Sequence, residues 1–144
     1  MKTLLFAIFL AWGLLQAHGS VLQLERMIWS TTGKSALFSY SWYGCFCGIG
    51  GRGTPVDPTD WCCHAHDCCY RKLREGNCSP LITPYSFEVA NKDILCSNNQ
   101  TWCEREICLC DKAVALCFAS NLHSYNISYL FYFKLKCHSK KLEC

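Results

Sequence analysis

The eleven residues Asp60–Tyr70 constrain the fold of this chain more than any other segment. They read DWCCHAHDCCY and hold four cysteines, two histidines and two aspartates. An ordinary core helix would not contain such a segment, because burying unpaired charge costs free energy. On a helix, Cys62, His66 and Cys69 recur at spacings of four and three residues and therefore share one face. We interpret the stretch as a helix whose cysteines are all in disulfides and whose His66–Asp67 pair does chemistry.

The start of the chain and its cysteine content indicate an exported protein. Lys2 precedes an apolar run of about 12 residues, and small residues follow up to Gly19, a pattern typical of a signal peptide. All 14 cysteines lie in residues 20–144, of which they make up about 11%. Zinc would need free thiolates, which a secretory route disfavours. We therefore expect a signal peptide at 1–19, one domain at 20–144, and seven disulfides in a secreted, extracellular protein.

Local signals predict three helices and a small sheet. The first helix spans residues 20–31, and its apolar residues fall at helical spacing. The second spans 58–75, with Asp57 as N-cap and an acid, Asp60, near the positive end of the dipole. The third spans 101–119 and is opened by a capping box, Thr101–Glu104. Alternation over 85–89, a polar turn and the apolar residues 94–96 predict a two-stranded wing.

The cysteine spacing predicts how the two long helices pair. Cysteines recur every seven residues in the third helix and at the same interval in the second. Two antiparallel helices could therefore be linked by two disulfides, Cys62–Cys117 and Cys69–Cys110. This register places Asp111 opposite position 68, where its carboxylate is within reach of His66.

The segment Tyr43–Pro55 reads YGCFCGIGGRGTP and has five glycines in its first eleven residues. Such a sequence favours tight turns rather than a helix. A loop of this kind could cradle phosphate with N–H groups, but that function needs a preceding buried strand. Alternatively, its carbonyl groups could form a cage for Ca²⁺, with Asp67 as the charged ligand. A structural glycine turn is the third interpretation.

The segments Asp60–Tyr70 and Tyr43–Pro55 resemble the active-site helix and the calcium loop of the secreted phospholipase A2 family. The segment Cys108–Lys112, which reads CLCDK, also resembles a segment of that family. The resemblance covers essentially the whole of residues 20–144, and the C-terminal Cys144 places the chain nearest the group II branch. It implies a mainly α, disulfide-rich fold with two long antiparallel helices, a short N-terminal helix, a calcium loop and a β-wing. It also implies calcium-dependent hydrolysis of the sn-2 ester of glycerophospholipids, releasing a fatty acid and a lysophospholipid.

The resemblance further assigns roles to individual residues. His66 would be the general base that activates water, and Asp111 would orient it. Calcium would be bound by the carbonyl groups of Phe46, Gly48 and Gly50 and by the Asp67 carboxylate. Tyr70 and Tyr85 would donate to Asp111, although packing in an aromatic core explains them nearly as well. Val21, Leu24 and Ile28 would line the acyl channel. The remaining disulfides would be Cys45–Cys137, Cys47–Cys63, Cys68–Cys144, Cys78–Cys103 and Cys96–Cys108.

The net charge and the distribution of basic residues indicate which classes of partner the protein could bind. A formal net charge of +3 does not indicate a nucleic-acid-binding protein. The basic residues near the end, Lys134, Lys136, His138, Lys140 and Lys141, could bind anionic lipid, an anionic glycan or a cell-surface receptor, or could form a solvated tail. We expect a monomer that binds membrane surfaces peripherally. A non-catalytic receptor ligand or toxin-like binding protein on the same scaffold is the alternative function.

Several other residues lead to specific expectations. Trp29, Leu37, Phe38 and Trp42 could be core residues or an exposed docking patch. Tryptophans at positions 29 and 61, where family members often have basic residues, favour tolerance of zwitterionic lipid. His64 is expected at the surface and not as a second base. The sequence contains three glycosylation sequons, which begin at Asn77, Asn99 and Asn126.

Overall fold

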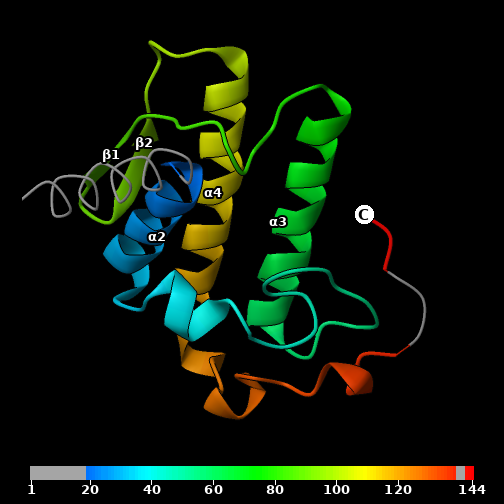
Figure 1. Cartoon of the computed structure of the whole chain (residues 1–144). Helices are drawn as coiled ribbons and strands as arrows, with labels where there is room; N and C mark the ends of the chain where they lie inside the picture. Colours follow the sequence, from blue (N-terminus) through cyan, green and yellow to red (C-terminus); the bar gives the residue numbers. More distant parts are fainter. Residues whose placement is uncertain (1–18, 139–141) are drawn as a thin grey trace, which may run out of the picture.

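The computed structural model describes residues 19–138 and 142–144. Its body consists of three α-helices, α2 (Gly19–Thr32), α3 (Pro58–Glu75) and α4 (Trp102–Ser120). A two-stranded antiparallel sheet, β1 (Phe87–Ala90) and β2 (Asp93–Cys96), lies next to α4 (Figure 1). Short helical turns occupy the connections: η1 (Ala36–Tyr40), η2 (Leu122–Ser124), η3 (Ile127–Tyr129) and η4 (Lys134–Lys136). Among the described helices, none combines the length and the apolar character that crossing a bilayer requires.

The two long helices begin where side chains satisfy free backbone N–H groups. Asp57 accepts from the Asp60 N–H at 2.8 Å, and Pro58 takes the first helical position. Thr101 accepts from the Glu104 N–H at 3.2 Å, and the Glu104 side chain returns a bond to the Thr101 backbone. Both helices therefore start at the predicted caps and end within one residue of the predicted positions.

α3 and α4 run antiparallel and side by side, as Figure 1 shows. The disulfides Cys62–Cys117 and Cys69–Cys110 link them. The other five pairs are Cys45–Cys137, Cys47–Cys63, Cys68–Cys144, Cys78–Cys103 and Cys96–Cys108. These are the seven pairs expected from the sequence. The predicted fold class is confirmed, including the β-wing, which the Cys96–Cys108 bridge ties to α4.

α2 packs against α4 with one face and presents its other face to solvent. Met27 and Ile28 are fully buried, and the Thr31 hydroxyl donates to the Ala115 carbonyl at 3.3 Å. The four bulky residues whose location was open are all more than half exposed: Trp29, Leu37, Phe38 and Trp42. They are therefore surface residues, which rules out the core interpretation, and docking through them stays a prediction.

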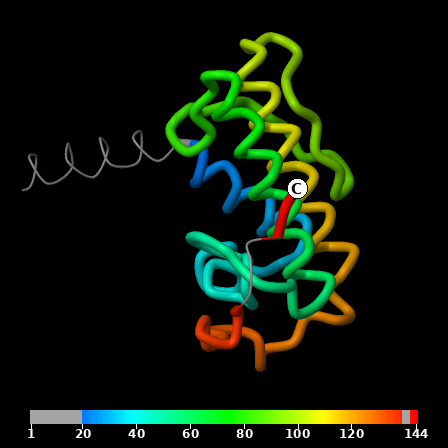
Figure 2. The backbone as a smooth tube through the Cα atoms, turned by 90° about the vertical axis from the view of Figure 1, so that its right-hand side faces the viewer, coloured from blue at the N-terminus to red at the C-terminus, as the bar shows by residue number. Residues whose placement is uncertain are grey.

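The C-terminal segment packs against the glycine-rich loop. An isolated bridge pairs Tyr43 with Leu130, and the Gly44 N–H donates to the Tyr129 carbonyl at 2.9 Å. Figure 2 shows this segment, in orange and red, crossing below the loop before the chain returns to α3. The expected signal peptide, apart from Gly19, and Lys140 and Lys141 of the basic cluster lie outside the described residues.

Candidate active site

A cavity of about 460 Å³ lies between α2, α3 and the glycine-rich loop. Its lining is mainly apolar and includes Val21, Leu24 and Ile28 from α2, the residues predicted to line a channel. α3 contributes the polar side chains His66 and Asp67 to the same cavity. The cavity therefore combines an apolar wall, which suits a hydrocarbon chain, with a small group of polar side chains.

His66 and Asp111 meet at the side of the cavity. The His66 Nε2 atom lies 2.7 Å from an Asp111 oxygen, Oδ1. Asp111 is completely buried, whereas the His66 side chain is 13% exposed. The helix pairing inferred from cysteine spacing therefore brings these two side chains together. Because Nε2 faces Asp111, Nδ1 is the ring nitrogen left for the cavity.

Two tyrosines complete the surroundings of the Asp111 carboxylate. Tyr70 donates to Oδ1 and Tyr85 donates to Oδ2, each at 2.5 Å. Burial, followed by the nearby charge of Asp111, raises the pKa of both tyrosines well above the ordinary value. Both hydroxyls therefore remain donors throughout the physiological pH range. Three donors hold one buried carboxylate, which fixes the orientation of the His66 ring.

The glycine-rich loop is shaped by close approaches and by one buried acid. The Asp60 carboxylate is completely buried and accepts from the backbone N–H groups of Cys45, Phe46 and Val56 at 2.8–2.9 Å. A Cβ atom at Gly44 would lie 2.5 Å from this carboxylate, so only glycine fits there. From the sequence we expected Asp60 only to interact favourably with the positive end of the helix dipole. Its hydrogen bonds to the loop were not predicted.

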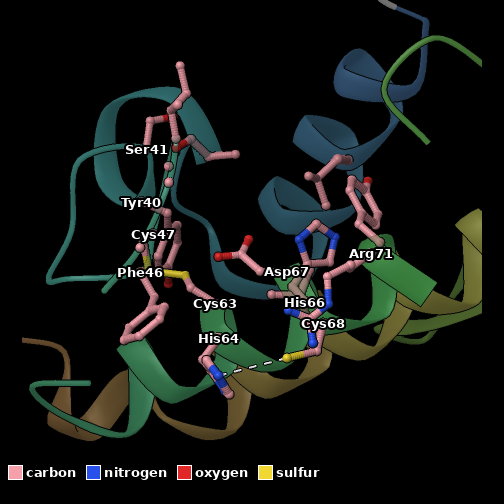
Figure 3. Close-up of a pocket in the computed structure, with 18 of the residues that line it drawn as sticks. Tyr40, Ser41, Phe46, Cys47, Cys63, His64, His66, Asp67, Cys68 and Arg71 are labelled. Atoms are coloured by element: carbon pink, nitrogen blue, oxygen red, sulfur yellow. Dashed lines mark hydrogen bonds between the residues drawn. A yellow bond between two sulfur atoms is a disulfide. The ribbon is translucent and has the colours of Figure 1, made fainter. Parts of the chain in front are cut away.

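Residues of the loop and Asp67 line the cavity together. Figure 3 shows the Asp67 carboxylate pointing from α3 toward the loop that carries Phe46 and Cys47. Gly48 and Gly50 line the cavity with positive φ angles of 103° and 78°, which L side chains rarely adopt. Backbone carbonyl groups and a carboxylate are the donors preferred by hard cations such as Ca²⁺. The residues present therefore fit such an ion chemically.

His64 does not lie at the surface, and that prediction is wrong. Its residue exposure is only 8%, and its ring packs edge-on against Phe46 and Trp61. Its Nε2 atom lies 3.3 Å from the Leu142 carbonyl, because the Cys68–Cys144 disulfide brings the tail over this side of α3. His64 lies on a different side of the helix from His66 (Figure 3). Although His64, Cys68 and Cys144 are close enough to suggest a metal site, both sulfur atoms are used by the disulfide.

Lys134 is a second residue whose role sequence reasoning missed. Its ammonium group donates to the Gly44 carbonyl at 2.6 Å, although 90 residues separate the two positions. Burial lowers the pKa of Lys134, and the charges of Asp60 and Asp67 oppose this shift. One lysine of the C-terminal basic cluster is therefore a contact of the glycine-rich loop. No local sequence signal indicates this contact, because the tail reaches the loop only in the folded chain.

Comparisons with known proteins agree with this architecture. The family model for phospholipase A2 matches residues 21–130. The chain is 44% identical over 144 residues to a group IID secretory phospholipase A2 of Mus musculus, and all of both chains is covered. It is 46% identical over 145 residues to a human protein named phospholipase A2, membrane associated, again over the whole of both chains. A basic phospholipase A2 of Craspedocephalus puniceus is 50% identical over 131 residues, with 91% of this chain and 93% of the relative covered. The chain therefore belongs to the phospholipase A2 family, and within it the chain is similar to group II members.

Proposed function

We propose that this phospholipase A2 hydrolyses the sn-2 ester of glycerophospholipids at membrane surfaces, in a calcium-dependent reaction that uses His66 as general base. The observation that supports the proposal most strongly is the buried Asp111 carboxylate, which lies 2.7 Å from His66 beside an apolar cavity. The apolar wall suits the acyl chain of a lipid, and the polar group is positioned for ester chemistry.

The proposed role of His66 follows from its two ring nitrogens. Asp111 accepts from Nε2–H, so the lone pair on Nδ1 can take a proton from water as its oxygen attacks the ester carbonyl. The imidazole gains positive charge in this step, and the Asp111 carboxylate stabilises it. Tyr70 and Tyr85 hold the carboxylate in place and donate no proton to the reaction. A serine nucleophile is not required.

The proposed calcium ligands are the carbonyl groups of Phe46, Gly48 and Gly50 and the carboxylate of Asp67. When bound, Ca²⁺ would supply positive charge that binds the substrate phosphate and polarises the ester carbonyl. The Gly48 backbone N–H would stabilise the oxyanion from the loop side. Asp60 supports this assignment because it fixes the backbone N–H of Phe46, whose carbonyl would be a ligand.

We also propose that the protein is secreted and binds membranes peripherally as a monomer. Cleavage after Gly19 would leave Ser20 as the first residue. The exposed residues Trp29, Leu37 and Phe38 provide apolar contacts from α2 and η1. Such contacts would allow binding to zwitterionic lipid, because tryptophan insertion does not need an anionic headgroup. Binding of an anionic glycan or a receptor by the C-terminal basic residues stays a prediction.

Positional analysis of the products tests the reaction. The substrate is a phospholipid with different acyl chains at its two positions, presented in vesicles with millimolar calcium. We expect release of the sn-2 fatty acid only, and a rate reduced by about 10²–10⁴ in His66→Gln. His123→Gln, a change of an exposed histidine outside the cavity, should keep the wild-type rate. Wild-type release from the sn-1 position, or an unchanged rate in His66→Gln, would contradict the proposal.

A further inference from the structure

One of the three glycosylation sequons lies in an unusually open position. The sequon Asn126–Ser128 follows the end of α4 and enters η3. All three of its residues are exposed, and the middle residue, Ile127, is 76% exposed. Figure 1 shows this segment, in orange, below the helices.

The hydrogen bonds of Asn126 leave its amide nitrogen open. The backbone N–H of Asn126 donates to the Tyr43 hydroxyl at 3.0 Å, which fixes the residue on the surface. Its side-chain oxygen accepts from the Ser128 N–H at 2.9 Å and from the Ser128 hydroxyl at 2.7 Å. Within residues 19–138 and 142–144, the Nδ2 atom has no hydrogen-bond partner. The turn therefore holds the asparagine and the hydroxyl residue together and leaves the reactive nitrogen exposed.

The other two sequons are held more tightly by their middle residues. Cys78 is 2% exposed and is bridged to Cys103, so the sequon that starts at Asn77 is drawn into the protein at its centre. The Gln100 side chain forms hydrogen bonds with the backbone of Ser86 and Ser97, which ties the sequon of Asn99 to the β-wing. Only the sequon of Asn126 has a middle residue that points freely into solvent.

We propose that Asn126 carries an N-linked oligosaccharide, an inference that rests on the proposed secretory route. The donor would be an oligosaccharide on a polyprenyl diphosphate, used by a transferase of that route. The Asn126 Nδ2 atom forms a bond to the anomeric carbon of the first sugar, and the bond between that carbon and the diphosphate oxygen breaks. The polyprenyl diphosphate leaves, and one amide proton passes to a base of the transferase.

The position of Asn126 also determines what the glycan leaves unaffected. None of the described residues between 119 and 138 lines the cavity. A glycan on Asn126 therefore extends over the end of the molecule beyond α4 and does not enter the acyl channel. Its nearest apolar neighbour in the chain is Ile127, whose exposed side chain it shields. We infer a solubilising modification that is compatible with hydrolysis.

The test uses full-length protein secreted by a cultured animal cell line. An amidase that removes N-glycans converts each occupied asparagine to aspartate, and peptide mass spectrometry locates the change. We expect conversion at Asn126, loss of the glycan in Ser128→Ala and its retention in Ser128→Thr. Both variants change the same side chain, so a general folding defect would be expected in both. A glycan that is lost in Ser128→Ala and kept in Ser128→Thr therefore reports on the need for a hydroxyl at this position. Asn77→Gln serves as the control in which the glycan on Asn126 is retained.

The same samples report on activity with a short-chain phospholipid dispersed as monomers. Ser128→Ala should hydrolyse it at a rate within about twofold of the wild type, because surface changes away from the site have small effects. Unmodified Asn126 in active enzyme collected from the medium would overturn the glycan proposal and leave the hydrolase intact. A protein glycosylated at Asn126 but inactive toward phospholipid would instead contradict the proposed function.

Discussion

Replacing Asp60 with asparagine should release the glycine-rich loop from its anchor. In the native chain, Oδ2 accepts from the N–H groups of Cys45 and Val56, and Oδ1 accepts from that of Phe46. An amide has only one acceptor oxygen. If that oxygen takes the position of Oδ2, an NH₂ group faces the Phe46 N–H, and this buried donor loses its partner. The two remaining bonds also lose the contribution of the negative charge.

The expected magnitude follows from these three contacts. A hydrogen bond to a charged group contributes about 1.5–3 kcal/mol, and a buried donor without a partner costs about 1–3 kcal/mol. We therefore expect Asp60→Asn to lower the free energy of unfolding by about 3 kcal/mol. The Phe46 backbone should shift as well, and calcium affinity should fall because the Phe46 carbonyl is a proposed ligand.

Guanidinium unfolding with the disulfides intact measures the first effect, and calorimetric titration with calcium measures the second. Asp93→Asn is the control, because Asp93 is exposed and its ion pair with Lys112 spans 3.7 Å. Its unfolding free energy should stay within about 0.5 kcal/mol of the wild type. If Asp60→Asn were equally stable and bound calcium with wild-type affinity, the anchoring role of Asp60 would be refuted.

Three further predictions concern polar side chains. Tyr85→Phe removes a 2.5 Å bond to Asp111 and should lower the free energy of unfolding by about 1–3 kcal/mol, measured by guanidinium unfolding. Tyr40→Phe should cost less than about 0.5 kcal/mol in the same measurement, since the buried Tyr40 hydroxyl has no hydrogen-bond partner among the described residues. Burial raises the pKa of Tyr40 to about 12, so its contribution to stability is complete below pH 10 and is lost as the pH rises toward 12. Between pH 10 and 12 the free energy of unfolding should therefore fall less in Tyr40→Phe than in the wild type. An equal fall in both proteins would contradict the raised pKa of Tyr40. Lys134→Met removes the bond to the Gly44 carbonyl and should accelerate amide hydrogen exchange in the loop, whereas Lys136→Met should not.

Helix ends were predictable because local signals specify them, whereas five of the seven cysteine pairs were expected only from the resemblance to a family. Asp57, Pro58 and the Thr101–Glu104 box act within one helical turn, so their effect does not depend on distant residues. The seven-residue cysteine spacing fixed the relative register of α3 and α4, and this register brought Asp111 to His66. The glycine content predicted a turn-rich loop, and the resemblance to a family then favoured calcium among its three interpretations.

The features that were missed depend on contacts between distant segments. An acid in the first turn of a helix has the same sequence signature whether it interacts with the helix dipole or binds another loop, so the contacts of Asp60 were not predictable. His64 was assigned to the surface because it lies two residues before His66 and therefore points to a different side of the helix, but residues 142–144 cover it in the folded chain. Lys134 reaches Gly44 only because the tail is bridged to the loop through Cys45–Cys137.

Calcium-dependent release of fatty acid tests the central claim most directly. Oxidised, folded protein is mixed with phospholipid vesicles, first with millimolar calcium and then with an excess of chelator. The account predicts release that stops on chelation, returns when calcium is restored and is lost in His66→Gln. Folded protein that releases no fatty acid under any of these conditions would contradict the account and support a ligand without turnover on the same scaffold.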